Sequence, residues 1–182
     1  MQTGYDVWDF GSPILPHAMS QIEKAARYFK ESGFRFSAYW HSALVRSAQT
    51  SFLLAELMGE RERKPRIKEE LGPGEPEMWN WLYNTWKLHQ EEDKTSDIGT
   101  PEILQMWPDI CEREGTRILS AVRTIASGLA DGENAAAVSH NPLIRLGQYM
   151  ATGFPKPDLT HCQAICFTLE DGWLDCEDHL LR

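Results

Sequence analysis

The strongest constraint in the sequence is the stretch Asn134–Gly147, NAAAVSHNPLIRLG, which joins two kinds of hydrophobic pattern. A short apolar run, Ala135–Val138, stops at Ser139 and His140, and Pro142 then opens an amphipathic pattern. A run this short and apolar is typical of a buried parallel strand, and proline is best tolerated at the first position of a helix. The stretch therefore predicts a strand, a turn and a helix.

The turn in this stretch places the imidazole of His140 at the carboxyl end of a strand and beside the start of a helix. Free N–H groups and the positive end of the helix dipole make such a place ready to bind phosphate or another anion. His140 is therefore a candidate anion-binding residue. The alternative interpretation is that its side chain only caps the turn.

Composition limits the classes of protein to which the chain can belong. Its 182 residues, 42% of them hydrophobic, are enough for a sizeable core, and we predict a single domain over residues 1–182. The formal net charge of -9 disfavours nucleic-acid partners, because an acidic chain repels phosphate backbones. No apolar run approaches the ~20 residues that span a bilayer, so we expect no membrane partner.

Cysteine usage indicates the compartment. The four cysteines show no Cys-x-x-Cys spacing, and the chain has no signal peptide, so we expect reduced thiols and a cytoplasmic protein. His161, Cys162 and Cys166 are residue types that bind zinc, but alternation along a strand explains the two cysteines equally well. We therefore predict no metal ligands.

A second informative stretch is His41–Gly59, HSALVRSAQTSFLLAELMG. Ser42 is a residue type that caps helices, and the residues after it form an apolar stripe at helical spacing. Arg46 falls in the first turns of this predicted helix, where a cation opposes the helix dipole at a cost of ~0.3–1 kcal/mol. A compensating role is binding phosphate through two parallel hydrogen bonds, and the alternative is a solvated surface arginine.

The remaining patterns alternate between helices and strands. We predict helices from Pro16 to a stop at Gly33, over Glu75–Gln90, from Pro101, and over Glu112–Ala130; we predict short strands around Arg35–Trp40, near Ile67 and over Cys162–Leu169, followed by a polar tail. This order predicts a layered α/β domain with a largely parallel sheet flanked by helices. Ligands in such domains bind at the carboxyl ends of the strands, where Arg46 and His140 are both expected.

Together, three stretches resemble the histidine phosphatase superfamily, which has the phosphoglycerate-mutase-like fold. SALVRSAQT, Ser42–Thr50, is similar to the family's motif in which an arginine grips phosphate and a Gln-Thr pair follows. VSHNPLI, Val138–Ile144, is similar to its second-histidine motif, particularly in small phosphohistidine phosphatases. ILPHAMSQIEKAARYF resembles the family's early helix, with Ala18 where glycine is usual. The resemblance extends from about Ile14 to Leu169.

One motif of the family is absent from this sequence. The family begins with a strand that ends in Arg-His-Gly or Arg-His-Ala, whose histidine is the nucleophile, and no such tripeptide occurs here. Neither His17 nor His41 matches it. In the family this strand lies in the middle of the sheet, so we expect a domain that lacks its first central strand. Our hypothesis is a chain truncated at Met1; the alternative is a degenerate domain in which Tyr5–Phe10 take over the structural role.

The resemblance implies a phosphate monoester or phosphohistidine hydrolase that needs neither metal nor cofactor. It implies that Arg46, His140 and Asn141 bind phosphate, the first two with catalytic roles, and that the partner is a phosphorylated small molecule or a phosphohistidine protein. The alternative is an inactive pseudophosphatase that binds a phospho-ligand or a protein. Glu69, Glu70 and Glu75 match no clear acid motif and are interpreted as surface carboxylates. Core packing is favoured over a substrate cleft for the tryptophans at Trp79, Trp81 and Trp86.

Overall fold

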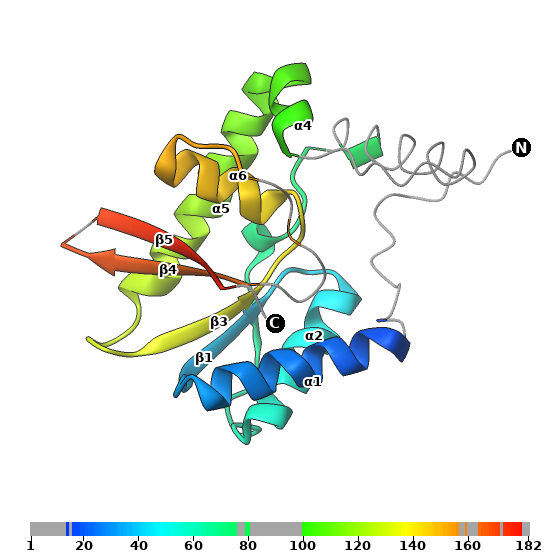
Figure 1. Ribbon diagram of the computed structural model, residues 1–182, viewed down its shortest axis with the longest axis vertical. Coiled ribbons are helices and arrows are strands. Elements are labelled where there is room, and N and C mark those ends of the chain that lie inside the picture. The colour runs from blue at the N-terminus through cyan, green and yellow to red at the C-terminus, as the bar shows by residue number, and fades with distance from the viewer. Residues whose placement is uncertain are drawn as a thin grey trace, which may run out of the picture.

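The computed structural model describes residues 14, 16–75, 79–80, 100–156, 159, 164–171 and 173–179, without the side chains of 16, 17 and 179. In chain order the elements are α1 (Pro16–Glu31), β1 (Phe36–His41), α2 (Val45–Met58), β2 (Arg66–Ile67), the 3₁₀ turn η1 (Glu69–Leu71), α4 (Thr100–Met106), α5 (Pro108–Ser127), β3 (Asn134–Val138), α6 (Leu143–Thr152), β4 (Ala164–Glu170) and β5 (Trp173–His179). Figure 1 shows their arrangement.

The central feature is a parallel sheet in the order β2-β1-β3. The register between β1 and β3 pairs Tyr39 with Ala136 and His41 with Val138, so the two strands end at the same level. Because parallel strands share one carboxyl edge, the turns after β1 and β3 lie close together in space although they are about 100 residues apart in sequence.

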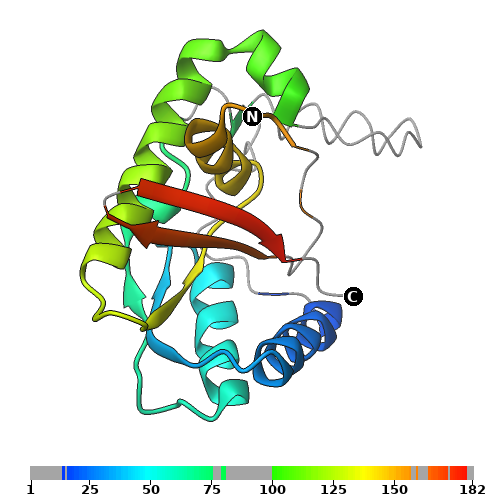
Figure 2. The ribbon, with the colours of Figure 1, turned by 60° about the vertical axis from the view of Figure 1, so that its left-hand side comes forward.

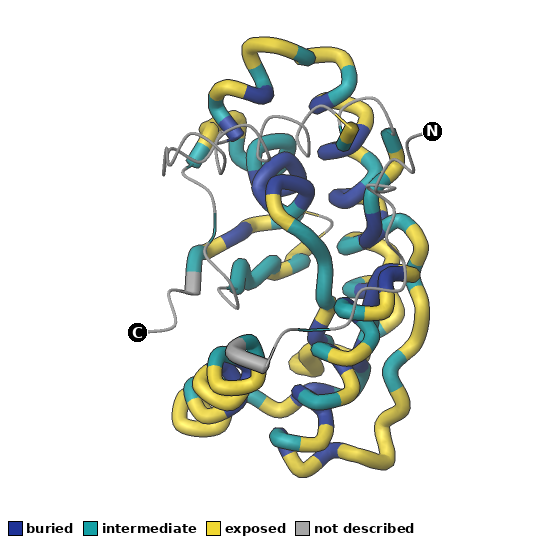
Figure 3. The backbone as a smooth tube through the Cα atoms, turned by 90° about the vertical axis from the view of Figure 1, so that its right-hand side faces the viewer, coloured by how far each residue is buried: buried dark blue, intermediate teal, exposed yellow. Residues whose placement is uncertain are grey.

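Helices cover both faces of this sheet, because its strands carry apolar residues on both sides. Phe36, Tyr39 and Ala136 face one side and pack with residues of α1 and α2. The adjacent residues Trp40 and Ala135 point the opposite way and pack with residues of α5. The tube in Figure 3 shows buried and exposed residues alternating along the helices, as expected when one face of each helix packs inward. The predicted α/β fold with a parallel sheet flanked by helices is confirmed.

Several predicted boundaries need correction. α5 begins at Pro108 rather than Glu112, with the proline at the start of the helix. Pro142 precedes α6 as its N-cap residue instead of occupying the first helical position. Ser42 does not cap α2, whose N-cap is Leu44, without a side-chain capping bond. Most of the helix predicted over Glu75–Gln90 lies outside the described residues, as do Trp81 and Trp86, whereas Trp79 packs against core residues of α4, α5 and α6.

The prediction of a polar tail after residue 172 is wrong, because these residues form β5, antiparallel to β4. Its residues alternate, with Cys176 buried and Asp175 and Glu177 exposed. Asp178 accepts a hydrogen bond of 2.6 Å from the guanidinium of Arg145, a residue of α6 that is buried. Asp178 is therefore not a solvated residue of a polar tail but the counter-ion of the buried Arg145 side chain. Figure 2 shows the β4–β5 hairpin in front of the parallel sheet.

The described strands form two separate sheets, with β3 at an edge of the first and β4 at an edge of the second. A sheet that lacks a central strand would have this form, and the absence of that strand stays a prediction. No helix within the described ranges combines the length and apolar character needed to cross a membrane.

Two glycines allow α5 and α6 to approach closely. A Cβ atom added at Gly115 would lie 2.8 Å from the backbone oxygen of Leu146 and 2.5 Å from Cγ of Met150. A Cβ atom added at Gly147 would lie 2.7 Å from Cγ2 of Ile118. Since real Cβ atoms do not approach other atoms this closely, a side chain at Gly115 forces the helices apart, and one at Gly147 requires the Ile118 side chain to shift.

We expect Gly115→Ala to lower the free energy of unfolding by about 2 kcal/mol, because the added methyl group overpacks the contact between α5 and α6. Gly128→Ala is the matched control, since its Cβ would meet no atom closer than 3.5 Å and its φ is -91°. The control is expected to be neutral or to stabilise by about 0.5 kcal/mol. Urea unfolding of both variants measures the difference, and equal effects would contradict the proposed role of Gly115.

Candidate functional site

The candidate site lies where β1 and β3 end, and hydroxyl groups tie these ends together. The hydroxyl of Ser47 donates a hydrogen bond of 2.9 Å to the carbonyl oxygen of Val138, the last residue of β3. The same hydroxyl accepts one of 3.2 Å from the backbone N–H of Ser42, which follows β1. The start of α2 is thereby fixed to both strand ends, and it places Arg46, the second residue of α2, at this edge of the sheet.

His140 contacts the residue that follows the neighbouring strand. Its Nε2 lies 2.7 Å from the hydroxyl oxygen of Ser42, which is fully buried. Burial lowers the pKa of His140 to about 3, and the positive charge of Arg46 contributes in the same direction. A partly buried imidazole beside a cation is disfavoured in its charged form, so His140 is neutral at physiological pH.

The structure therefore brings Arg46 and His140 together, close enough for the charge of one to affect the titration of the other. Asn141 is exposed in the same turn as His140. These three residues are the phosphate ligands that the sequence indicates, and their role in binding stays a prediction. A guanidinium and a neutral N–H donor side by side can each donate hydrogen bonds to different oxygens of one anion.

The turn η1 covers this pair of strand ends. The hydroxyl of Ser139 donates a hydrogen bond of 2.7 Å to the carbonyl oxygen of Leu71. Gly72 follows directly, and a Cβ atom added to it would lie 3.2 Å from Cβ of Ser42 and 3.3 Å from the carbonyl oxygen of Glu69. The absence of a side chain at Gly72 therefore allows the backbone after η1 to close over Ser42.

Two residues of α5 hold this turn in place, and sequence reasoning did not identify them. The Arg117 guanidinium donates hydrogen bonds of 2.8 Å to the carbonyl oxygen of Glu70 and 2.5 Å to that of Gly72. It also pairs at 2.8 Å with the buried carboxylate of Glu114, which accepts a hydrogen bond of 3.0 Å from the backbone N–H of Gly74. No local pattern marks such a contact, because its partners are separated by 40 or more residues in sequence.

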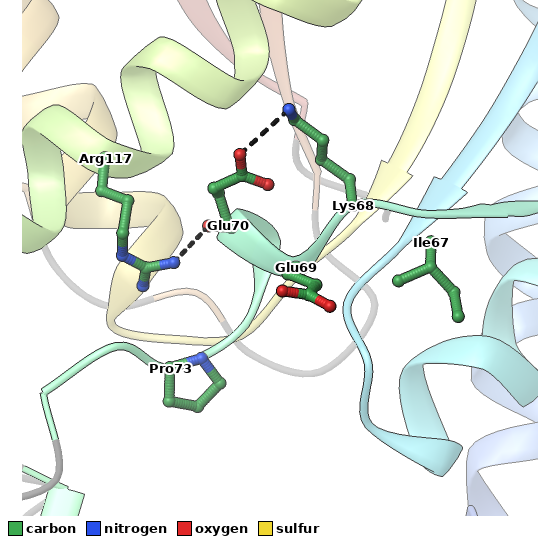
Figure 4. Close-up of a pocket in the computed structure, with 6 residues that line it drawn as sticks. All are labelled: Ile67, Lys68, Glu69, Glu70, Pro73 and Arg117. Carbon is green, nitrogen blue, oxygen red and sulfur yellow. Dashed lines mark hydrogen bonds and ion pairs between the residues drawn. The ribbon is translucent and has the colours of Figure 1, made fainter.

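An open pocket with a volume of about 590 Å³ adjoins the same turn (Figure 4). It is lined by Ile67, Lys68, Glu69, Glu70, Pro73 and Arg117. The Lys68 ammonium lies 3.1 Å from the Glu70 carboxylate. Figure 4 shows this pair and Arg117 reaching the backbone of Glu70. The pocket and the strand ends therefore share one short segment of chain.

The Glu70 carboxylate in this turn is a poor proton donor. A backbone hydrogen bond and the side chain of Lys68 hold the pKa of Glu70 below its usual value. Glu75 accepts a hydrogen bond of 2.9 Å from Arg113, and Glu69 is exposed. A general acid needs a proton at working pH, so Glu70 does not fit that role.

We found no group of three or more His, Cys, Asp or Glu side chains placed to hold a metal ion within the described part of the chain. Of the three residues considered for zinc, His161 and Cys162 lie outside that part. Cys166 lies in β4, paired with Glu177 of β5.

We expect Arg117→Met to lower the free energy of unfolding by about 3 kcal/mol, because it leaves the buried Glu114 carboxylate without its cation. Arg113→Met is the matched control on the same helix. Its partner, Glu75, is partly exposed, so the control should cost at most about 1 kcal/mol. Urea unfolding compares the two, and a loss for Arg117→Met no greater than that for Arg113→Met would contradict the role of Arg117 in holding this turn.

We expect His140 to stay neutral from pH 8 to below pH 5. Arg46→Gln should raise the pKa of His140 only part of the way to 6.5, because the variant removes the nearby charge but leaves the imidazole as buried as before. An unfolded histidine takes up its proton near pH 6.5, so His140 lowers stability as the pH falls from about 6.5 towards 3. NMR titration of the imidazole measures this pKa. Arg61→Gln, just beyond the other end of α2, should leave it unchanged, and a wild-type pKa near 6.5 would refute the assignment.

The fold is similar to those of a solved phosphoglycerate mutase and a solved phosphoserine phosphatase. A phosphoglycerate mutase from Bacillus anthracis str. Sterne has a TM-score of 0.66 and 19% identity, over 92% of this chain and 82% of that chain. A phosphoserine phosphatase from Entamoeba histolytica, solved with 3-phosphoglyceric acid, has a TM-score of 0.59 and 15% identity, over 92% and 84%. At these identities the likeness shows the fold alone, and it confirms the predicted phosphoglycerate-mutase-like fold.

Comparison with curated proteins gave no significant match. The family model described as "Histidine phosphatase superfamily (branch 1)" matches residues 9–170, which is most of the sequence. The resemblance seen in the two motifs and the early helix is thereby confirmed: this chain belongs to the histidine phosphatase superfamily.

Proposed function

We propose that the chain carries the phosphate-binding part of a metal-independent phosphatase site, which acts on a phosphate monoester or on a phosphohistidine protein. The observation that supports this best is the meeting of Arg46 with a neutral His140 at the carboxyl ends of two parallel strands. Family membership supports a phosphatase-type activity. Neither observation selects the substrate, and the preference for phosphohistidine rests on the sequence VSHNPLI.

In this proposal Arg46 is the main electrostatic ligand. Its planar guanidinium can donate two parallel hydrogen bonds to the equatorial oxygens of a phosphoryl group, and its charge offsets the negative charge that they carry. Its position in the first turn of α2 adds the positive end of the helix dipole to the same site. The unfavourable placement of a cation at a helix start is thereby explained by the anion that it binds.

His140 supplies a neutral donor in the same proposal. Because it carries no charge, its one N–H can bind a phosphoryl oxygen without releasing or taking up a proton. Donors that are already oriented before the reaction stabilise the developing charge without reorganisation. Asn141, exposed beside His140, adds an amide donor to the same anion.

A second candidate is a pseudophosphatase that binds a phospho-ligand or a protein and does not turn it over. The observation that favours it is the absence of Arg-His-Gly and Arg-His-Ala from the sequence, because these tripeptides carry the nucleophile in the resemblance. The two candidates share the phosphate ligands and differ in the presence of a nucleophile. Saturable binding of a partner that Arg46→Ala leaves unchanged would favour a protein-binding role.

We expect the purified chain to bind sulfate or vanadate weakly and to hydrolyse p-nitrophenyl phosphate at no meaningful rate. Arg46→Ala should weaken binding at least tenfold, since a charge-assisted hydrogen bond contributes about 1.5–3 kcal/mol. Arg61→Ala, which removes a largely exposed arginine beyond the far end of α2, is the control and should bind as the wild type does. Isothermal titration calorimetry and a colorimetric assay make the two measurements.

Two results would contradict this proposal. If Arg46→Ala and the wild type bind sulfate equally, Arg46 is not a phosphate ligand. Hydrolysis by the wild type that disappears in His140→Ala would show that the chain holds another nucleophile, and the expectation of binding without turnover would be wrong.

A further inference from the structure

We propose that Ser42 is a positioning residue that fixes the tautomer of His140: its hydroxyl donates to Nε2, and the ring proton is therefore on Nδ1. If the proposed function is correct, His140 then donates to a phosphoryl oxygen through Nδ1–H. The sequence suggested a different role for Ser42, that of a helix cap, which the structure contradicts.

The argument begins with the hydrogen bonds of the Ser42 hydroxyl. Among the described residues it has two partners: the backbone N–H of Leu44 at 3.3 Å and Nε2 of His140 at 2.7 Å. The backbone N–H of Leu44 can only donate, so the Ser42 hydroxyl oxygen is its acceptor. The hydroxyl proton then needs an acceptor, and Nε2 is the partner that can provide one.

The opposite assignment leaves a group unpaired. If Nε2 carried the proton, it would donate to the Ser42 oxygen, which already accepts from Leu44. The serine proton would then have neither of these two partners as an acceptor, although Ser42 has 0% of its surface exposed. A buried hydroxyl without an acceptor is costly, so the assignment with Nδ1–H is favoured.

The surroundings of Ser42 keep water from replacing this hydrogen bond. Gly72 closes over the serine, and the carbonyl oxygen of Gly72 is itself held at 2.5 Å by Arg117. On the other side, the backbone N–H of Ser42 is bonded to the carbonyl oxygen of Val138 and to the hydroxyl of Ser47. The serine is therefore fixed from both sides, and its hydroxyl has little freedom to turn to another acceptor.

The same facts argue against Ser42 as a nucleophile. A nucleophilic serine must reach the substrate, and Ser42 has no exposed surface. It also needs a base of suitable strength, and the low pKa of His140 makes this imidazole a weak base. The pair therefore orients a donor instead of activating a hydroxyl group.

NMR of the ¹⁵N-labelled free protein at pH 7 tests the proposal, because long-range proton–nitrogen correlations distinguish the two tautomers. We expect the His140 ring, assigned with His140→Gln, to be protonated on Nδ1 in the wild type. Ser42→Ala should give a mixture or the Nε2–H form, whereas Ser42→Thr keeps the hydroxyl and should retain Nδ1–H. Ser51→Ala is the matched control, since Ser51 is equally buried and donates to the carbonyl oxygen of Trp40.

The wild-type spectrum alone can overturn the proposal, even if a variant fails to fold: a proton on Nε2 shows that Ser42 is not the donor. An unchanged tautomer in folded Ser42→Ala also overturns it. Sulfate titrations then separate this proposal from the proposed function. We expect Ser42→Ala to bind sulfate about threefold to tenfold more weakly than the wild type and the Ser51→Ala control.

A wild type with Nδ1–H that binds no sulfate would leave the tautomer assignment standing and reject the proposed function. A changed tautomer in Ser42→Ala with unchanged sulfate affinity would reject the contact between Nδ1–H and the anion.

Discussion

The parallel pairing of β1 with β3 is the interaction on which the rest of the site depends. It aligns the ends of two strands that are separated by about half of the chain, and the Ser47 hydroxyl joins these ends to the start of α2. Arg46 and His140 are neighbours because of this backbone register, which requires no direct bond between them. A slip of this register would move the turn after β3 away from the start of α2.

Electrostatics and burial act together at this edge of the sheet. A guanidinium at a helix start and a charged imidazole in a partly buried place are each unfavourable when considered alone, and the charge of Arg46 makes protonation of His140 less favourable. The imidazole adapts by remaining neutral, whereas the guanidinium cannot lose its proton. The result is one fixed positive charge with an uncharged hydrogen-bond donor beside it, an arrangement suited to an anion that carries several oxygens.

Local patterns in the sequence were sufficient to predict the α/β class and to select Arg46 and His140, because strand, turn and helix signals are contained in about fifteen residues. They were insufficient where a residue's role depends on a distant partner. Ser42 is a residue type that often caps helices, whereas its contact with His140 forms only because the sheet brings the ends of β1 and β3 together. In the sequence Asp178 resembles a surface residue of a polar tail, and only the fold shows that it pairs with Arg145. Arg117 binds backbone carbonyl oxygens, and the sequence of side chains does not indicate where these oxygens lie.

One turn of α5 faces two parts of the site at once. Glu114 and Arg117 bind the segment that follows η1, while Gly115, between them in sequence, contacts the backbone of α6, the helix that begins just after His140. Segments tied to the same rigid turn tend to open and close as one cooperative unit. The segment around Gly72 that lies over Ser42 and the turn that carries His140 should therefore exchange their amide hydrogens with similar free energies of opening. The site is then exposed by a shared subglobal opening of α5 and α6 and not by independent motion of a loop.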